Sequence, residues 1–137
     1  MPSASHQWLV TWIARKMVHD GFTVRGIDGS IPHGALWNDL ASPFMIASGR
    51  PDIWGVHRDG SLAIGEAKTV DDIDTRHTRL QFGVYTSLFE EGLGRCRIYV
   101  AVPRSGVLLL DRVLATHASA LRRVVRLHVP DCLLEAA

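Results

Sequence analysis

The chain has 137 residues and a formal net charge of +1, from 15 lysines and arginines against 14 aspartates and glutamates. This length suits one domain, and 47% hydrophobic residues are enough to build a core without disulfides or structural metals. We therefore expect a single domain over residues 1–137. The near-neutral charge argues against a purely electrostatic nucleic-acid scaffold, although a local basic patch would be enough for binding.

The cysteines and the apolar segments bear on where the protein works. Cys96 and Cys132 form neither a disulfide framework nor a zinc motif, which favours a reducing environment. The first ten residues lack the pattern of a signal peptide. The apolar run Val107 to Leu110 is too short to cross a membrane. These features predict a cytoplasmic protein with no membrane partner.

The first third of the chain predicts a helix, a strand and a long loop. Ser3 or Ser5 can cap a helix whose apolar residues recur at helical spacing up to Met17, and Gly21 ends it. Phe22 to Ile27 is typical of a short strand. Residues 28–50 are rich in glycine and proline and predict a loop with at most one helical turn. Such a long loop in a small domain is usually functional.

The rest of the chain alternates between strands and helices. An Asp59-Gly60 turn joins two strand-like segments into a hairpin. Asp74 or Thr75 can cap the helix that follows the hairpin. The predicted elements are strands at Asp52–His57 and Ser61–Ala67, a helix to about Glu91, a strand at Arg97–Val102, a helix at Val107–Arg122 and a strand at Val124–Val129. This order predicts an α/β fold with a central mixed β-sheet flanked by helices.

Three charged residues should meet at one end of the hairpin. Residues two apart on a strand share a face, so Glu66 and Lys68 should project together, with Ala67 facing the other way. The tight turn brings Asp52 level with Glu66. Two carboxylates suit a hard cation such as Mg²⁺ or Mn²⁺, which can activate water for phosphodiester hydrolysis. Lys68 could stabilise the transition state or help to deprotonate the water.

This arrangement resembles the PD-(D/E)XK nuclease superfamily. The matching residues are Pro51-Asp52 and Glu66-Ala67-Lys68, and the helix that follows carries the QxxxY motif of the RecB-like branch as Gln81 and Tyr85. The match covers residues 49 to 85.

The resemblance implies a restriction-endonuclease-like fold and a Mg²⁺- or Mn²⁺-dependent deoxyribonuclease that acts on DNA, as in repair or recombination. Asp52, Glu66 and the Ala67 carbonyl would bind the metal. Lys68 would be catalytic, and Gln81 and Tyr85 would position the substrate and the lysine.

One departure from the family leaves an alternative function open. Many members place an acidic residue in the first helix, but residues 4–19 contain none. The polar candidates there are His6, Gln7 and His19, with Asp20 at the helix end. The alternative is a nuclease-like module that holds DNA or a protein without cutting. Either kind of protein could act as a homodimer or as a subunit of a larger nuclease complex.

Each candidate also has an ordinary structural interpretation. Glu66 and Lys68 could form a solvated ion pair, although their small and apolar neighbours favour a buried and therefore functional pair. Tyr85 could simply pack beside a core stripe of Leu80, Val84 and Leu88. Aromatic residues could stack on bases or pack in the core, and arginines could bind phosphates or form a solvated face. These are Trp37, Phe44 and Trp54, and Arg76, Arg79, Arg104, Arg122 and Arg123.

Overall fold

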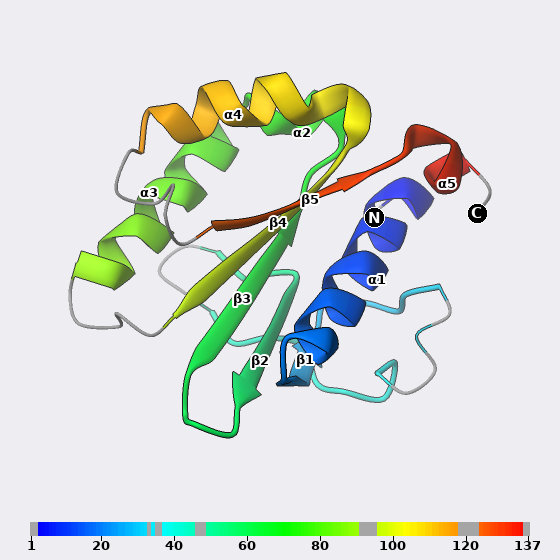
Figure 1. Cartoon of the computed structure of the whole chain (residues 1–137), viewed down its shortest axis with the longest axis vertical. Helices are drawn as coiled ribbons and strands as arrows, with labels where there is room; N and C mark the ends of the chain where they lie inside the picture. The colour runs from blue at the N-terminus through cyan, green and yellow to red at the C-terminus, as the bar shows by residue number, and fades with distance from the viewer. Residues whose placement is uncertain are drawn as a thin grey trace.

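The computed structural model describes residues 3–32, 34, 37–45, 49–90, 96–117 and 124–135. Its centre is a five-stranded sheet in the order β1-β2-β3-β4-β5 (Figure 1). The strands are β1 (Phe22–Ile27), β2 (Ile53–His57), β3 (Leu62–Ala67), β4 (Arg97–Pro103) and β5 (Val124–Val129). The first three pair antiparallel and the last three parallel, so the sheet is mixed.

Helices cover both faces of this sheet (Figure 1). They are α1 (Ala4–His19), α2 (Val70–Ile73), α3 (Arg76–Glu90), α4 (Val107–Ala115) and α5 (Asp131–Glu135), with a 3-10 turn at Arg104–Gly106. One core lies between the sheet and α1 with α5, and the other lies between the sheet and α2, α3 and α4. The predicted α/β architecture with a flanked mixed sheet is confirmed. None of the helices in the described part of the chain is both long and apolar enough to span a bilayer.

Helix α1 lies close against β3. The Ser3 hydroxyl caps it by accepting a hydrogen bond from His6 N at 3.1 Å. The chain leaves it through Gly21, at φ 95°. Gly65 allows the close approach, because a Cβ there would lie 2.8 Å from Ile13 and 2.6 Å from Ile53. The first turn of α1 is therefore held at a fixed height above the central strands.

The structure differs from the sequence predictions at three places. The one-turn helices α2 and α5 were not predicted, because a single turn is too short to show a helical period. The predicted helix over 107–122 ends at Ala115. Backbone amides of Thr116 and His117 bond to carbonyls three residues back, which tightens the last turn. Residues 118–123, like Gly92 and Gly94, lie outside the described residues.

Candidate active site

The hairpin brings Asp52 beside the end of β3, as the sequence predicted. Ile53 pairs with Gly65 across the two strands, and Asp52 N donates to the Gly65 carbonyl at 3.1 Å. The Asp52 side chain crosses the same gap, where its Oδ2 accepts from Ala67 N at 2.8 Å. The turn that sets this register contains Gly60 at φ 89°, a conformation suited to glycine.

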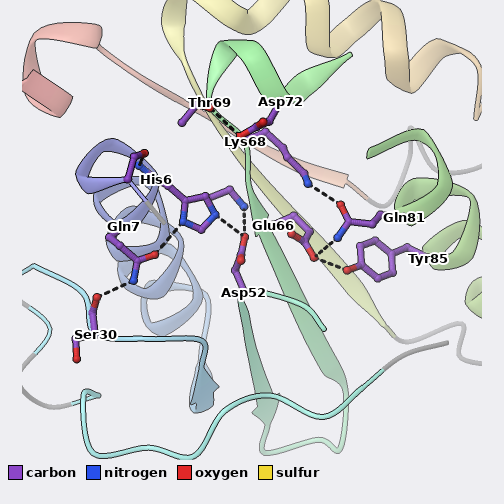
Figure 2. Close-up of polar contacts among 12 residues, drawn as sticks. His6, Gln7, Ser30, Asp52, Glu66, Lys68, Thr69, Asp72, Gln81 and Tyr85 are labelled. Carbon is purple, nitrogen blue, oxygen red and sulfur yellow. Dashed lines mark hydrogen bonds and ion pairs between the residues drawn. The ribbon is translucent and has the colours of Figure 1, made fainter. Parts of the chain in front are cut away.

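Glu66 and Lys68 are buried, with only 2% and 7% of their surfaces exposed. Both are held by α3 (Figure 2). Lys68 Nζ donates to Gln81 Oε1 at 2.6 Å, while Gln81 Nε2 lies 3.5 Å from Glu66 Oε1. The Tyr85 hydroxyl donates to the same Glu66 oxygen. The structure therefore joins the three hairpin residues and the two helix residues in one polar network.

The lysine is also fixed through its backbone. Lys68 lies just beyond the end of β3, and its N–H donates to the Ala101 carbonyl of β4 at 3.0 Å. The parallel pairing of β3 with β4 therefore extends to Lys68. A buried amino group with a fixed backbone and a fixed side-chain acceptor has few rotamers open to it, which favours a defined position for its charge.

Part of the predicted α3 core stripe is wrong. Leu80 is 59% exposed, and the side chain of Leu88 lies outside what the structure describes. The buried face of α3 instead carries Thr78, Phe82 and Tyr85. The Thr75 hydroxyl accepts from Thr78 N at the start of the helix and helps to fix its rotation, which turns Gln81 and Tyr85 toward β3.

The two carboxyl groups have opposite pKa shifts. Burial raises the pKa of Glu66 well above its usual value, and the neighbouring Asp52 raises it further. Burial also raises the pKa of Asp52, but the hydrogen bond and charge of His6, together with the hydrogen bonds of Ala67 N and Glu66, lower it overall. Asp52 is therefore the group that carries negative charge, while Glu66 tends to keep a proton. A cation placed between them would compensate the charge that now favours this proton.

His6 is the residue that the first helix contributes to the site. Its Nε2 lies 3.2 Å from Asp52 Oδ2 (Figure 2). Burial lowers the pKa of His6, but the hydrogen bond and charge of Asp52 raise it overall. His19 is exposed at the other end of the helix, and Asp20 pairs with Lys16 at 3.1 Å. A sequence signal for His6 existed, because it precedes Leu9 and Ile13 on the stripe that faces the sheet.

Gln7 sets the orientation of the His6 ring. Its Nε2 donates to the Ser30 carbonyl at 2.7 Å, which leaves its Oε1 to accept from His6 Nδ1 at 2.9 Å (Figure 2). With Nδ1 as donor, Nε2 is the nitrogen that faces Asp52. The loop after β1 thus takes part in the site through a backbone carbonyl.

The oxygen donors of the site suit a hard divalent cation. Asp52 and Glu66 supply carboxylates, and Ala67 supplies a backbone carbonyl at the same strand end. Within the described ranges, no group of three or more His, Cys, Asp or Glu side chains is arranged to hold a metal. Burial is the main cause of the raised pKa of Glu66, and the charge of Asp52, the next cause, is what such a cation would neutralise.

Several other sequence candidates lie outside this network. Arg79 pairs with Asp74 at 2.7 Å, and Trp37 packs against the core beneath α1. Arg76 and Arg104 are exposed, and neither contacts the network. Arg122 and Arg123 lie outside the described residues. Phe44 and Trp54 contact one another, with ring centroids 5.0 Å apart.

The molecule is thus an α/β domain with a buried acid, acid and lysine site at the end of a hairpin. No family model matches the chain. A search of curated proteins found no match. Among solved structures, it is similar to a repair endonuclease from Pyrococcus abyssi, with a TM-score of 0.48 and 19% identity. That alignment covers 95% of this chain and 48% of the other, so the chain spans about half the length of that protein. The function is therefore inferred from the geometry of the site.

Proposed function

We propose that the chain is a metal-dependent nuclease that hydrolyses phosphodiester bonds in DNA. The observation that supports this proposal is the convergence of Asp52, Glu66 and Lys68 in one buried network. Burying two acids and an amine is costly, and such clusters with perturbed pKa values are typical of functional sites. The PD-(D/E)XK pattern of the sequence supports the same reaction.

The residues divide into metal-binding, charge-stabilising and positioning groups. Asp52, Glu66 and the Ala67 carbonyl would hold Mg²⁺ or Mn²⁺, and His6 would hold the Asp52 side chain in position from the first helix. When bound, the cation would supply positive charge to the phosphoryl group and lower the pKa of a water molecule. Binding requires Glu66 to lose its proton, so the affinity for metal should rise with pH.

Lys68 would supply the protein's own positive charge. Its amino group is held by the Gln81 side-chain oxygen, so it is already oriented before a phosphate arrives. We propose that it donates to the phosphoryl oxygen on which negative charge develops. Removing one such preorganised donor typically lowers kcat by about 10²- to 10³-fold. Gln81 and Tyr85 act as positioning residues, one on the lysine and one on Glu66.

The test compares DNA cutting by the parent and by matched variants. Purified protein is incubated with single-stranded, linear, circular and branched DNA, with and without Mn²⁺. Cutting should need the metal and should be lost in Lys68→Ala and Asp52→Asn without loss of the fold. Lys16→Ala is the control, because Lys16 pairs with Asp20 away from the site. Equal cutting by Lys68→Ala and the parent would rule out the proposed role of the lysine.

One observation favours the alternative of a non-catalytic module. Helix α1 contributes a histidine to the site where many nucleases have an acid, so the chain offers fewer negatively charged ligands. Calorimetric titration with Mn²⁺ separates the two functions. A nuclease should bind Mn²⁺ and lose this binding in Asp52→Asn. Binding of DNA without any metal binding would instead support the module.

A further inference from the structure

We propose that an unpaired segment of single-stranded DNA binds beside the active site on an aromatic platform. The platform consists of Phe44 and Trp54. Two exposed arginines are close to it along the chain: Arg25 precedes Gly26, which pairs with Trp54, and Arg50 precedes Trp54 by four residues. This proposal rests on the proposed nuclease function, because it specifies the form of DNA that the active site would receive. Its binding chemistry can be tested without metal and without cutting.

The platform lies next to the site along β2. Trp54 follows Asp52 by two positions, which is about 6.8 Å along a strand and the same side of the sheet. Ile53, between them, packs into the core under α1. Trp54 packs instead against the core that contains Ile64 and Tyr85. A base repeat is about 3.4 Å in a stacked strand, so a base on the platform would lie within about two nucleotides of the scissile phosphate.

The neighbouring strand is shaped to carry the indole. The pairing of β1 with β2 shifts register between Val24 and Gly26, so Arg25 lies in a β-bulge. Gly26 pairs with Trp54, and a Cβ at residue 26 would lie only 2.6 Å from Trp54 Nε1. The absence of a side chain at Gly26 therefore lets the indole lie across the bulge. Bulges near active sites commonly redirect one side chain, which here is the exposed Arg25.

The exposure and charge of these residues indicate a ligand. Phe44 packs on Trp54 at 77° between the ring planes and keeps 44% of its surface exposed. Arg79 and Arg126 are paired with Asp74 and Asp111. Arg25 and Arg50, by contrast, have no carboxylate partner among the described residues. The segment 40–51 contains no Asp or Glu. An exposed phenyl ring, supported by a half-buried indole and accompanied by unpaired arginines, matches the bases and phosphates of a single strand.

This chemistry selects single strands over duplexes. The flat faces of the bases are covered by stacking in a duplex and are free in an unpaired segment. An aromatic side chain can therefore stack on an unpaired base without first opening a helix. The arginines would bind either form through the phosphates, but only the rings can distinguish the two.

The experiment measures binding in EDTA, which removes the metal and prevents cutting. Fluorescence anisotropy compares a labelled twelve-nucleotide oligothymidine with a duplex of twelve base pairs. The single strand should bind more tightly. Phe44→Ala should weaken its binding by about 5- to 150-fold, the usual range for one stacked base, and Phe44→Trp should restore it. Arg25→Ala should lower the dependence of log affinity on log salt concentration by about 0.7.

The control is Leu108→Ala, since Leu108 is 80% exposed on α4 and should not affect binding. Unchanged binding by Phe44→Ala, tighter binding of the duplex or no binding of the single strand would each overturn the platform. Comparing oligothymidine binding in EDTA with cutting in Mn²⁺ separates this proposal from the nuclease function, because the platform should bind whether or not the metal is present. Binding that persists in a parent protein that never cuts would overturn the nuclease and leave the platform standing.

Discussion

Removing the Tyr85 hydroxyl should affect both stability and metal binding. In Tyr85→Phe the ring remains in its buried place, because Tyr85 is only 3% exposed and packs in the core beneath α3 and α4. The change removes the donor to Glu66 Oε1, which leaves that oxygen with the 3.5 Å contact from Gln81 Nε2. Leaving a buried polar group without its partner costs about 1–3 kcal/mol, so the free energy of unfolding should fall by that amount.

The same variant should bind metal at a higher pH than the parent. Among the effects on Glu66, the Tyr85 hydrogen bond is one that lowers its pKa, while burial and Asp52 raise it. Without the hydroxyl, Glu66 keeps its proton to a higher pH and competes with the cation over a wider range. Calorimetric titrations with Mn²⁺ between pH 6 and pH 9 measure this shift, and guanidinium unfolding of the metal-free protein measures the loss of stability.

Tyr99→Phe is the matched control. Tyr99 is fully buried on the opposite face of the sheet, where its hydroxyl donates to Asp20 Oδ2 at 2.7 Å. Its loss should lower stability and leave the pH dependence of Mn²⁺ binding unchanged. The reasoning fails if Tyr85→Phe binds Mn²⁺ with the pH dependence of the parent, or if both variants shift it equally.

Two further predictions concern stability against pH in the metal-free protein. The pKa of Glu66 is raised in the folded protein above the ordinary glutamate value of 4.5, so parental stability should fall as pH rises from that value through the folded pKa. Glu66→Gln should lack this fall and be more stable than the parent at pH 8. Thermal unfolding measures this, and melting temperatures of variant and parent that change with pH in parallel would contradict the prediction. The pKa of His6 is raised above 6.5, so its ion pair with Asp52 stabilises the fold below pH 6.5 and is lost as pH rises through the folded pKa. In chemical unfolding, the free energy of unfolding of His6→Gln should be about 1 kcal/mol lower than that of the parent at pH 6. The difference between the two free energies should be smaller at pH 8.

The hairpin and its charged end could be predicted because the signals are local. The Asp59-Gly60 turn fixes which residues of the two strands face each other. Alternation along the strands then places Glu66 and Lys68 on one side. The spacing of Gln81 and Tyr85 placed them on one face of a helix, while the expectation that this face lies beside the hairpin came from the resemblance to the nuclease superfamily.

The contribution of α1 depends on packing between distant segments. The sequence left His6, Gln7, His19 and Asp20 open, since helical spacing alone does not say which end of the helix reaches the hairpin. The structure selects His6 because Gly65 lets α1 approach β3 at one height. The role of Gln7 depends on a carbonyl in a loop 23 residues away, which no local pattern indicates.

The prediction that Leu80 lies in the core was wrong for a different reason. Its spacing with Val84 suggested a core stripe, but α3 is rotated so that the face with Phe82 and Tyr85 is buried. Apolar residues occur on two adjacent faces of this helix, and the contacts with the sheet decide between them. The boundary of α4 was missed for a related reason, because its last turn is closed by local amide bonds at Thr116 and His117 while apolar residues continue along the sequence.

The bond from Lys68 N to the Ala101 carbonyl has a consequence for how the protein is made. The Lys68 backbone reaches its position in the folded chain only when β4, synthesised some thirty residues later, has come to lie parallel to β3. Parallel pairing between distant segments is among the slower steps in folding. A growing chain that has produced Asp52, Glu66 and Lys68 therefore still lacks the strand that fixes the lysine, and the polar network assembles only when β4 has joined the sheet.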